Sequence, residues 1–182
     1  EFANPTRFRW VSAGLVLVAL LFAGMINPFF AKSIDALAGQ NPMSRPEPDW
    51  TRMPDLLGDW ADTPFVLSMR AMHTISSLGD FDVTLSPSTL SELPDQSEFS
   101  IDPRNGRPVV AKLDTVATIL RCEPEGLIVS NNRFWTPERQ LEWMPLFEAA
   151  GRSIETREKR QLFALRWSGG AADAAACELL PQ

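Results

Sequence analysis

The residues that could take part in the widest range of reactions lie around the single histidine of the chain, His73. Met69 and His73 are four residues apart, so they share one face if this segment is helical. Thioether and imidazole ligands suit copper(I), but a packed helix face that carries methionine has the same spacing. Neither Ser76 nor Ser77 lies in the Gly-x-Ser-x-Gly turn that exposes a nucleophilic serine. The histidine therefore defines an alternative function, an enzyme or metal-handling domain centred on His73.

Closely spaced carboxylates are the other candidates for acid–base chemistry, namely Glu123 with Glu125, Glu92 with Asp95, and Asp80 with Asp82. Each pair lies in or beside an expected turn, where acidic side chains are common. The mixed charges from Arg152 to Arg160 indicate a solvated face or turn. The chain has no Walker A loop, no Gly-x-Gly-x-x-Gly motif and no EF-hand loop. The sequence therefore predicts no catalytic, cofactor-binding or metal-binding residue, and no cofactor.

The two cysteines, Cys122 and Cys177, are expected to form a disulfide. A bridge between them would tie the C-terminal helix to the end of the preceding long strand. It requires an oxidising compartment, and the topology described below provides one. Two separate buried thiols are the alternative.

The charge balance excludes one class of partner. Among 182 residues, 23 Asp and Glu outweigh 17 Lys and Arg, for a formal charge of −6. Affinity for nucleic acid comes from surplus Lys and Arg, so no nucleic-acid partner is expected. One histidine and two cysteines are also too few for the common four-ligand zinc modules.

An uncharged apolar run extends over residues 10–31 and predicts a transmembrane helix. At about 1.5 Å per residue it spans about 33 Å, close to the ~30 Å hydrocarbon core of a bilayer. A cleaved signal peptide is the alternative, but the run exceeds the ~7–15 apolar residues typical of one. Arg7 and Arg9 precede the run, so the positive-inside rule places residues 1–9 in the cytoplasm and the remainder outside. The preference for arginine over lysine is typical of a GC-rich bacterial genome, which makes the expected location the inner membrane, with a periplasmic C-terminal domain.

Residues 32–62 are expected to form a Pro-rich tether, because several prolines interrupt any helix there. The tether carries too many apolar side chains for a free linker, including Trp50, Met53, Leu56 and Trp60. One interpretation packs them on the domain of the same chain. The hypothesis that we carry forward docks them on a partner subunit or on the lipid bilayer, since tryptophan is enriched at both kinds of surface.

Residues 63–182 are expected to form a small α+β domain with a mostly antiparallel sheet. Thr-Pro pairs and glycines bound two predicted helices, and alternating apolar residues mark the predicted strands. The expected order is a helix over 64–79, a strand over 81–85, a turn at 102–106, strands over 109–122 and 127–130, a helix over 137–150, a strand over 160–167, and a helix over 171–180.

The predicted function follows from this architecture and from the lack of a catalytic constellation in the sequence. We expect a non-catalytic accessory or assembly subunit of a larger bacterial inner-membrane complex, either respiratory, photosynthetic or secretory. Its partners would be the other subunits of that complex and the bilayer. The alternative is a membrane-anchored periplasmic enzyme or metal-handling domain centred on His73.

Overall fold

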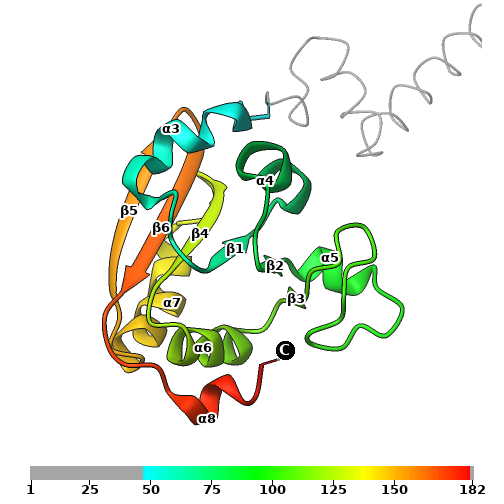
Figure 1. The fold of residues 1–182 in the computed structure, drawn as a ribbon, viewed down its shortest axis with the longest axis vertical. Helices are drawn as coiled ribbons and strands as arrows, with labels where there is room; N and C mark the ends of the chain where they lie inside the picture. The colour runs from blue at the N-terminus through cyan, green and yellow to red at the C-terminus, as the bar shows by residue number, and fades with distance from the viewer. Residues whose placement is uncertain (1–46, 181–182) are drawn as a thin grey trace, which may run out of the picture. The chain divides into compact units, whose positions relative to one another are not determined.

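The computed structural model describes residues 47–180, and its compact unit begins at Pro48 (Figure 1). The expected cytoplasmic segment 1–9, the membrane helix 10–31 and the first part of the tether lie outside the described residues. Among residues 47–180, no helix combines the length and the apolar character needed to cross a bilayer. The domain therefore starts about 15 residues before the expected boundary at residue 63, because the second half of the tether belongs to it.

Short helices alternate with the strands of one sheet. In chain order the elements are η1 (Trp50–Arg52), α3 (Met53–Leu57), η2 (Gly58–Trp60), β1 (Val66–Ser68), α4 (Ala71–Leu78), β2 (Val83–Leu85), α5 (Pro87–Ser91), β3 (Val109–Val110), α6 (Leu113–Cys122), β4 (Gly126–Asn131), α7 (Pro137–Ala149), β5 (Ser153–Lys159), β6 (Leu162–Ser168) and α8 (Ala174–Cys177).

The six strands form one mixed sheet in the order β3-β2-β1-β4-β6-β5. Strands β1 to β4 pair in parallel, whereas β6 runs antiparallel to both β4 and β5. The prediction of a mostly antiparallel α+β sheet is therefore wrong, and the domain is α/β. Parallel neighbours need a crossover connection, usually a helix. Here α4 connects β1 to β2, and α5 with the loop after it connects β2 to β3.

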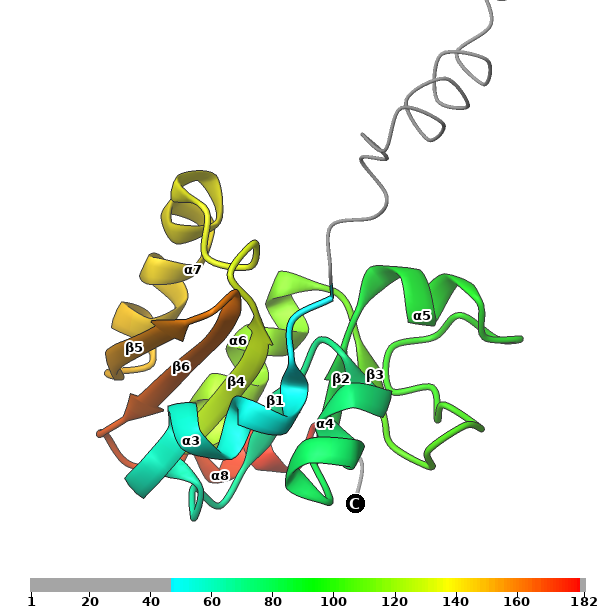
Figure 2. The ribbon, with the colours of Figure 1, turned by 90° about the horizontal axis from the view of Figure 1, so that it is seen from above.

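Helices cover both faces of the sheet (Figures 1 and 2). On one face, α6 and α7 pack their buried side chains on strand residues such as Leu67, Ile128 and Leu165. On the other face, the η1–α3–η2 segment packs on Leu127 and Val129 of β4 and on neighbouring residues of β6. Because successive residues of β4 point to opposite faces, this one strand contributes to both cores.

The segment after β3 is a helix, although its alternating β-branched residues predicted a strand over 109–122. Val116, Ile119 and Leu120 are buried, and their spacing of three and four residues is that of a helical face. Asp114 in the first turn and Arg121 in the last turn complement the helix dipole. Tertiary packing on one side has therefore prevailed over local β-propensity.

The segment after Thr63-Pro64 is also different from the prediction, because it enters strand β1 instead of a helix over 64–79. The Thr63 hydroxyl donates to the Trp60 carbonyl at 2.8 Å, so it closes the preceding turn and caps no helix. Leu67 pairs with Val83 on one side and Ile128 on the other. The helix begins only at Ala71 and ends before Gly79, as α4.

Several predicted elements are confirmed. Strand β2 lies within 81–85, β6 matches 160–167 closely, and the turn at 102–106 forms. Helix α7 begins after Thr136, whose hydroxyl accepts from the Arg139 backbone N–H at 3.3 Å. The C-terminal helix is shorter than expected and is α8.

The apolar side chains of the tether are buried in the domain itself. Trp50, Met53, Leu56 and Trp60 are 4%, 0%, 7% and 2% exposed, respectively. They cover the sheet face formed by β4 and β6, and the Arg157 guanidinium lies 3.8 Å over the Trp60 ring. The expected contact surface for a partner or membrane is thus corrected to a core, because that sheet face would otherwise be open to water.

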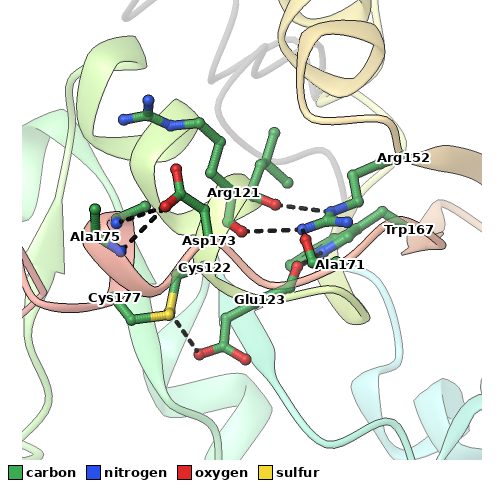
Figure 3. The surroundings of a disulfide bond; sticks show 11 residues. Arg121, Cys122, Glu123, Arg152, Trp167, Ala171, Asp173, Ala175 and Cys177 are labelled. Atoms are coloured by element: carbon green, nitrogen blue, oxygen red, sulfur yellow. Dashed lines mark hydrogen bonds between the residues drawn. A yellow bond between two sulfur atoms is a disulfide. The ribbon is translucent and has the colours of Figure 1, made fainter.

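Cys122 and Cys177 form the expected disulfide, which joins the end of α6 to α8 (Figure 3). Arg152 joins the same regions independently. Its guanidinium donates to the carbonyls of Leu120 at 2.8 Å and Arg121 at 3.1 Å, and to those of Gly169 and Ala171 after β6. Arg152 itself is buried. The charged stretch that follows it is the edge strand β5, and most of its side chains are exposed, as expected for a solvated face.

Candidate functional site

A polar cleft of about 220 Å³ lies at the carboxyl ends of the parallel strands β1 and β2. In α/β domains this edge of the sheet is where ligands usually bind, because the loops after the strands converge there. Three segments line the cleft, namely Met69 to His73 after β1, Ser86, Ser88 and Thr89 after β2, and Asp102, Arg104 and Asn105 in the following turn. We call these residues the basic cleft.

The loop after β1 is held by a buried hydrogen bond. The hydroxyls of Ser68 and Thr74 lie 2.6 Å apart, and Ser68 Oγ also accepts from the backbone N–H of Arg70 at 3.1 Å. No side chain of the described residues caps α4, whose first residues, Ala71 and Met72, line the cleft. The positive end of this helix therefore faces the cleft.

The loop after β2 contributes hydroxyl groups. Ser86 caps α5 by accepting from the Thr89 backbone N–H at 3.2 Å, and its hydroxyl lies 3.0 Å from that of Ser88. Ser86 and Pro87 form a helix start of the kind that sequence can show. Their sequence gives no sign that they lie beside residues 69–73, because that depends on the parallel pairing of β1 and β2.

The turn after the long loop fixes an arginine in the cleft. Asp102 is 1% exposed and accepts from Arg104 Nε at 2.9 Å and Arg104 Nη2 at 3.0 Å. The Arg104 guanidinium holds the pKa of Asp102 below its usual value. A second carboxylate, that of Glu92, lies 3.5 Å from Arg104 Nη1 outside the cleft wall. Arg104 thus pairs with two carboxylates, and Arg70 is the second arginine among the described residues that line the cleft.

His73 belongs to the basic cleft, but the chemistry expected from Met69 and His73 does not assemble. Met69 precedes α4, and its sulfur accepts a hydrogen bond from Ser130 Oγ at 3.4 Å. The His73 ring packs on the Trp50 indole, with centroids 5.4 Å apart. Within residues 47–180, no three His, Cys, Asp or Glu side chains are grouped so as to hold a metal ion. Met69 and His73 therefore do not share a helix face, because Met69 precedes the helix that carries His73.

The other candidate residues from the sequence form hydrogen bonds or ion pairs within the domain. Ser76 and Ser77 donate to the His73 carbonyl, at 2.8 and 2.9 Å, within α4. Glu125 pairs with Arg166, with Glu125 Oε1 to Arg166 Nη2 at 2.5 Å, and Asp80 pairs with Arg107. Asp95 accepts from Ser97 and Ser100.

The site and the fold together define an α/β domain with a basic cleft at the carboxyl edge of a mixed, mostly parallel sheet. Comparisons with family models, with curated proteins and with solved structures find no match to this chain. The functional argument therefore rests on the geometry of the domain.

Proposed function

We propose that the chain is a non-catalytic accessory or assembly subunit of a bacterial inner-membrane complex, and that its basic cleft binds an acidic segment of a partner subunit. One observation carries this proposal. The cleft that brings Arg70, Arg104 and His73 together also includes Met72, which is 58% exposed. Arginine and methionine are both enriched at protein interfaces, where positive charge orients an acidic partner and an apolar side chain adds buried area.

A second exposed apolar side chain lies next to the cleft wall in sequence, although it is not among the residues that line the cleft. Ile101 is 54% exposed and directly precedes Asp102 of the cleft wall. Met72 is therefore the exposed apolar side chain on which the proposed contact rests. The contact is placed at the cleft and not at the apolar residues of the tether, because those side chains are buried in the domain.

The test compares two exposed apolar residues on opposite faces of the domain. Met72→Glu places a negative charge in the basic cleft, whereas Leu141→Glu makes the same kind of change on α7, where Leu141 is 80% exposed. After mild detergent extraction of the full chain, we expect Met72→Glu to reduce partner recovery about tenfold or more. Leu141→Glu should keep the partner, and both variants should keep the melting temperature of the parent. Recovery that is unchanged in Met72→Glu would reject the cleft as the contact.

One observation favours the enzyme alternative, because His73 lines the cleft together with Ser86 and Ser88. His73→Gln separates the two functions. With an accessory subunit, the variant can weaken assembly, but each assembled complex keeps its turnover. With an enzyme centred on His73, the complex assembles but its turnover is lost.

We also propose that residues 10–31 anchor the chain as a single-pass helix, with the domain in the periplasm. The charges of Arg7 and Arg9 support this orientation. The anchor would confine the domain near embedded subunits, which raises its effective concentration for them. A periplasm-specific reporter fused after Gln182 is expected to be active. Activity of a cytoplasmic reporter at that position, with an inactive periplasmic one, would contradict the proposed topology.

A further inference from the structure

A second pocket lies at the opposite edge of the sheet from the basic cleft. It has a volume of about 210 Å³, and Phe65 before β1 and Val83 at the start of β2 line it. The rings of Phe65 and Phe99, the side chains of Ile119 and Leu180, and the disulfide make its wall mostly apolar. By proportion to the ~150 Å³ cavity that admits benzene, it has room for about eight non-hydrogen atoms. We call it the amino-edge pocket.

Among the described residues that line this pocket, Glu123 is the ionisable one. Its Oε1 lies 3.6 Å from Cys122 Sγ (Figure 3). That sulfur has no proton to donate, because it is bonded to Cys177. Burial raises the pKa of Glu123, and the nearby charge of Asp82 raises it further. Both effects are unfavourable to a negative charge at this position.

Glu123 differs from its neighbour Glu125 in the absence of a cation. Glu125 has Arg166 as its partner. Among the residues that the structure describes, no Lys, Arg or His nitrogen forms a salt bridge with Glu123. An apolar pocket that contains one carboxylate, with a second carboxylate nearby, is complementary in shape and charge to an apolar molecule with a positive end.

We propose that the amino-edge pocket binds a small organic cation, with its ammonium group against Glu123 and its apolar body against Phe65 and Phe99. The ammonium would offset the cost of burying the carboxylate, and aromatic rings provide additional attraction for a cation. Asp82, whose Oδ2 accepts from the Val66 backbone N–H at 2.7 Å, adds negative charge near the same edge. This site is independent of the basic cleft and of the function proposed for it.

Three probes of nearly equal size test the proposal, and they differ in charge. Benzylamine is a cation at neutral pH, benzyl alcohol is neutral and benzoate is an anion. Titration of the full chain by calorimetry is expected to show saturable binding of benzylamine in the millimolar range, at least tenfold tighter than benzyl alcohol. Benzoate should bind more weakly than either. No saturable benzylamine binding, or equal affinity for benzyl alcohol, would overturn the proposal.

Two isosteric variants assign the charge preference to one residue. Glu123→Gln is expected to weaken benzylamine binding about tenfold and to leave benzyl alcohol binding unchanged. Glu125→Gln is the matched control and should leave the affinity for benzylamine unchanged. Circular dichroism of each variant without ligand establishes that it is folded. If folded Glu123→Gln binds benzylamine as tightly as the parent chain, Glu123 is not the ammonium partner and the proposal is wrong.

Discussion

Replacement of both Trp50 and Trp60 with alanine is expected to leave much of the domain unfolded at physiological temperature. Each side chain is almost fully buried against the β4 and β6 face of the sheet. Removal of a buried tryptophan or phenylalanine side chain costs about 3–5 kcal/mol. A pair of such losses is comparable with the whole stability of a typical domain, about 5–15 kcal/mol. Urea denaturation followed by far-ultraviolet circular dichroism measures the effect.

The single variants and one surface variant make this expectation specific. Trp60→Ala should lower the unfolding free energy by about 4 kcal/mol. Part of this loss comes from the missing contact with the Arg157 guanidinium. Leu141→Ala, at a position 80% exposed, should change the unfolding free energy by less than about 0.5 kcal/mol. If the double variant kept its unfolding midpoint and lost only a bound partner, the tryptophans would act as a docking surface instead of a core.

Removal of the Cys122–Cys177 disulfide is expected to lower the unfolding free energy by about 4 kcal/mol. The bridge joins residues 55 apart, and a closed loop of that length restricts the unfolded chain by about this amount in the chain-entropy account. Urea midpoints of the Cys122→Ala, Cys177→Ala double variant, compared with those of the oxidised parent, measure the loss.

The reduced parent chain is the matched control, and its unfolding midpoint should agree with that of the double variant. Both should still fold, because the Arg152 guanidinium holds the end of α6 to the segment after β6 without the bridge. A loss below about 1 kcal/mol would show that the bridge adds little to stability. Under non-reducing conditions, two freely alkylated thiols in extracted protein would contradict the presence of the bridge itself.

Local signals in the sequence were sufficient where a residue acts on its own neighbours. Thr136 followed by Pro137 is a helix start because the hydroxyl and the fixed proline backbone act within one turn, and α7 begins there. The Asn105-Gly106 turn depends on backbone conformations that these two residues adopt readily, and Gly106 has a φ of 72°. The disulfide was predicted from the presence of two cysteines and from the expected oxidising compartment alone.

The choice between helix and strand failed where burial decided it. Residues 113–122 carry β-branched side chains that are compatible with either structure. Only the position of the segment between the parallel strands β3 and β4, with one side packed on the sheet, makes it the helix α6. The Trp50–Trp60 segment likewise has no long amphipathic period, and its burial depends on the bare sheet face that strands more than 60 residues later provide.

The composition of the candidate sites was visible in the sequence, but their assembly was not. His73, Met69, Glu123 and the cysteines were all recognisable by residue type. The sequence by itself determined the helix cap at Thr136, the turn at 102–106 and the cysteine pair. The tertiary structure alone decided that the loops after β1 and β2 converge on the basic cleft, and that Glu123 lines an apolar pocket beside the disulfide. The physical reason is the parallel strand order, which brings together segments that are distant in sequence. No local sequence pattern marks that juxtaposition.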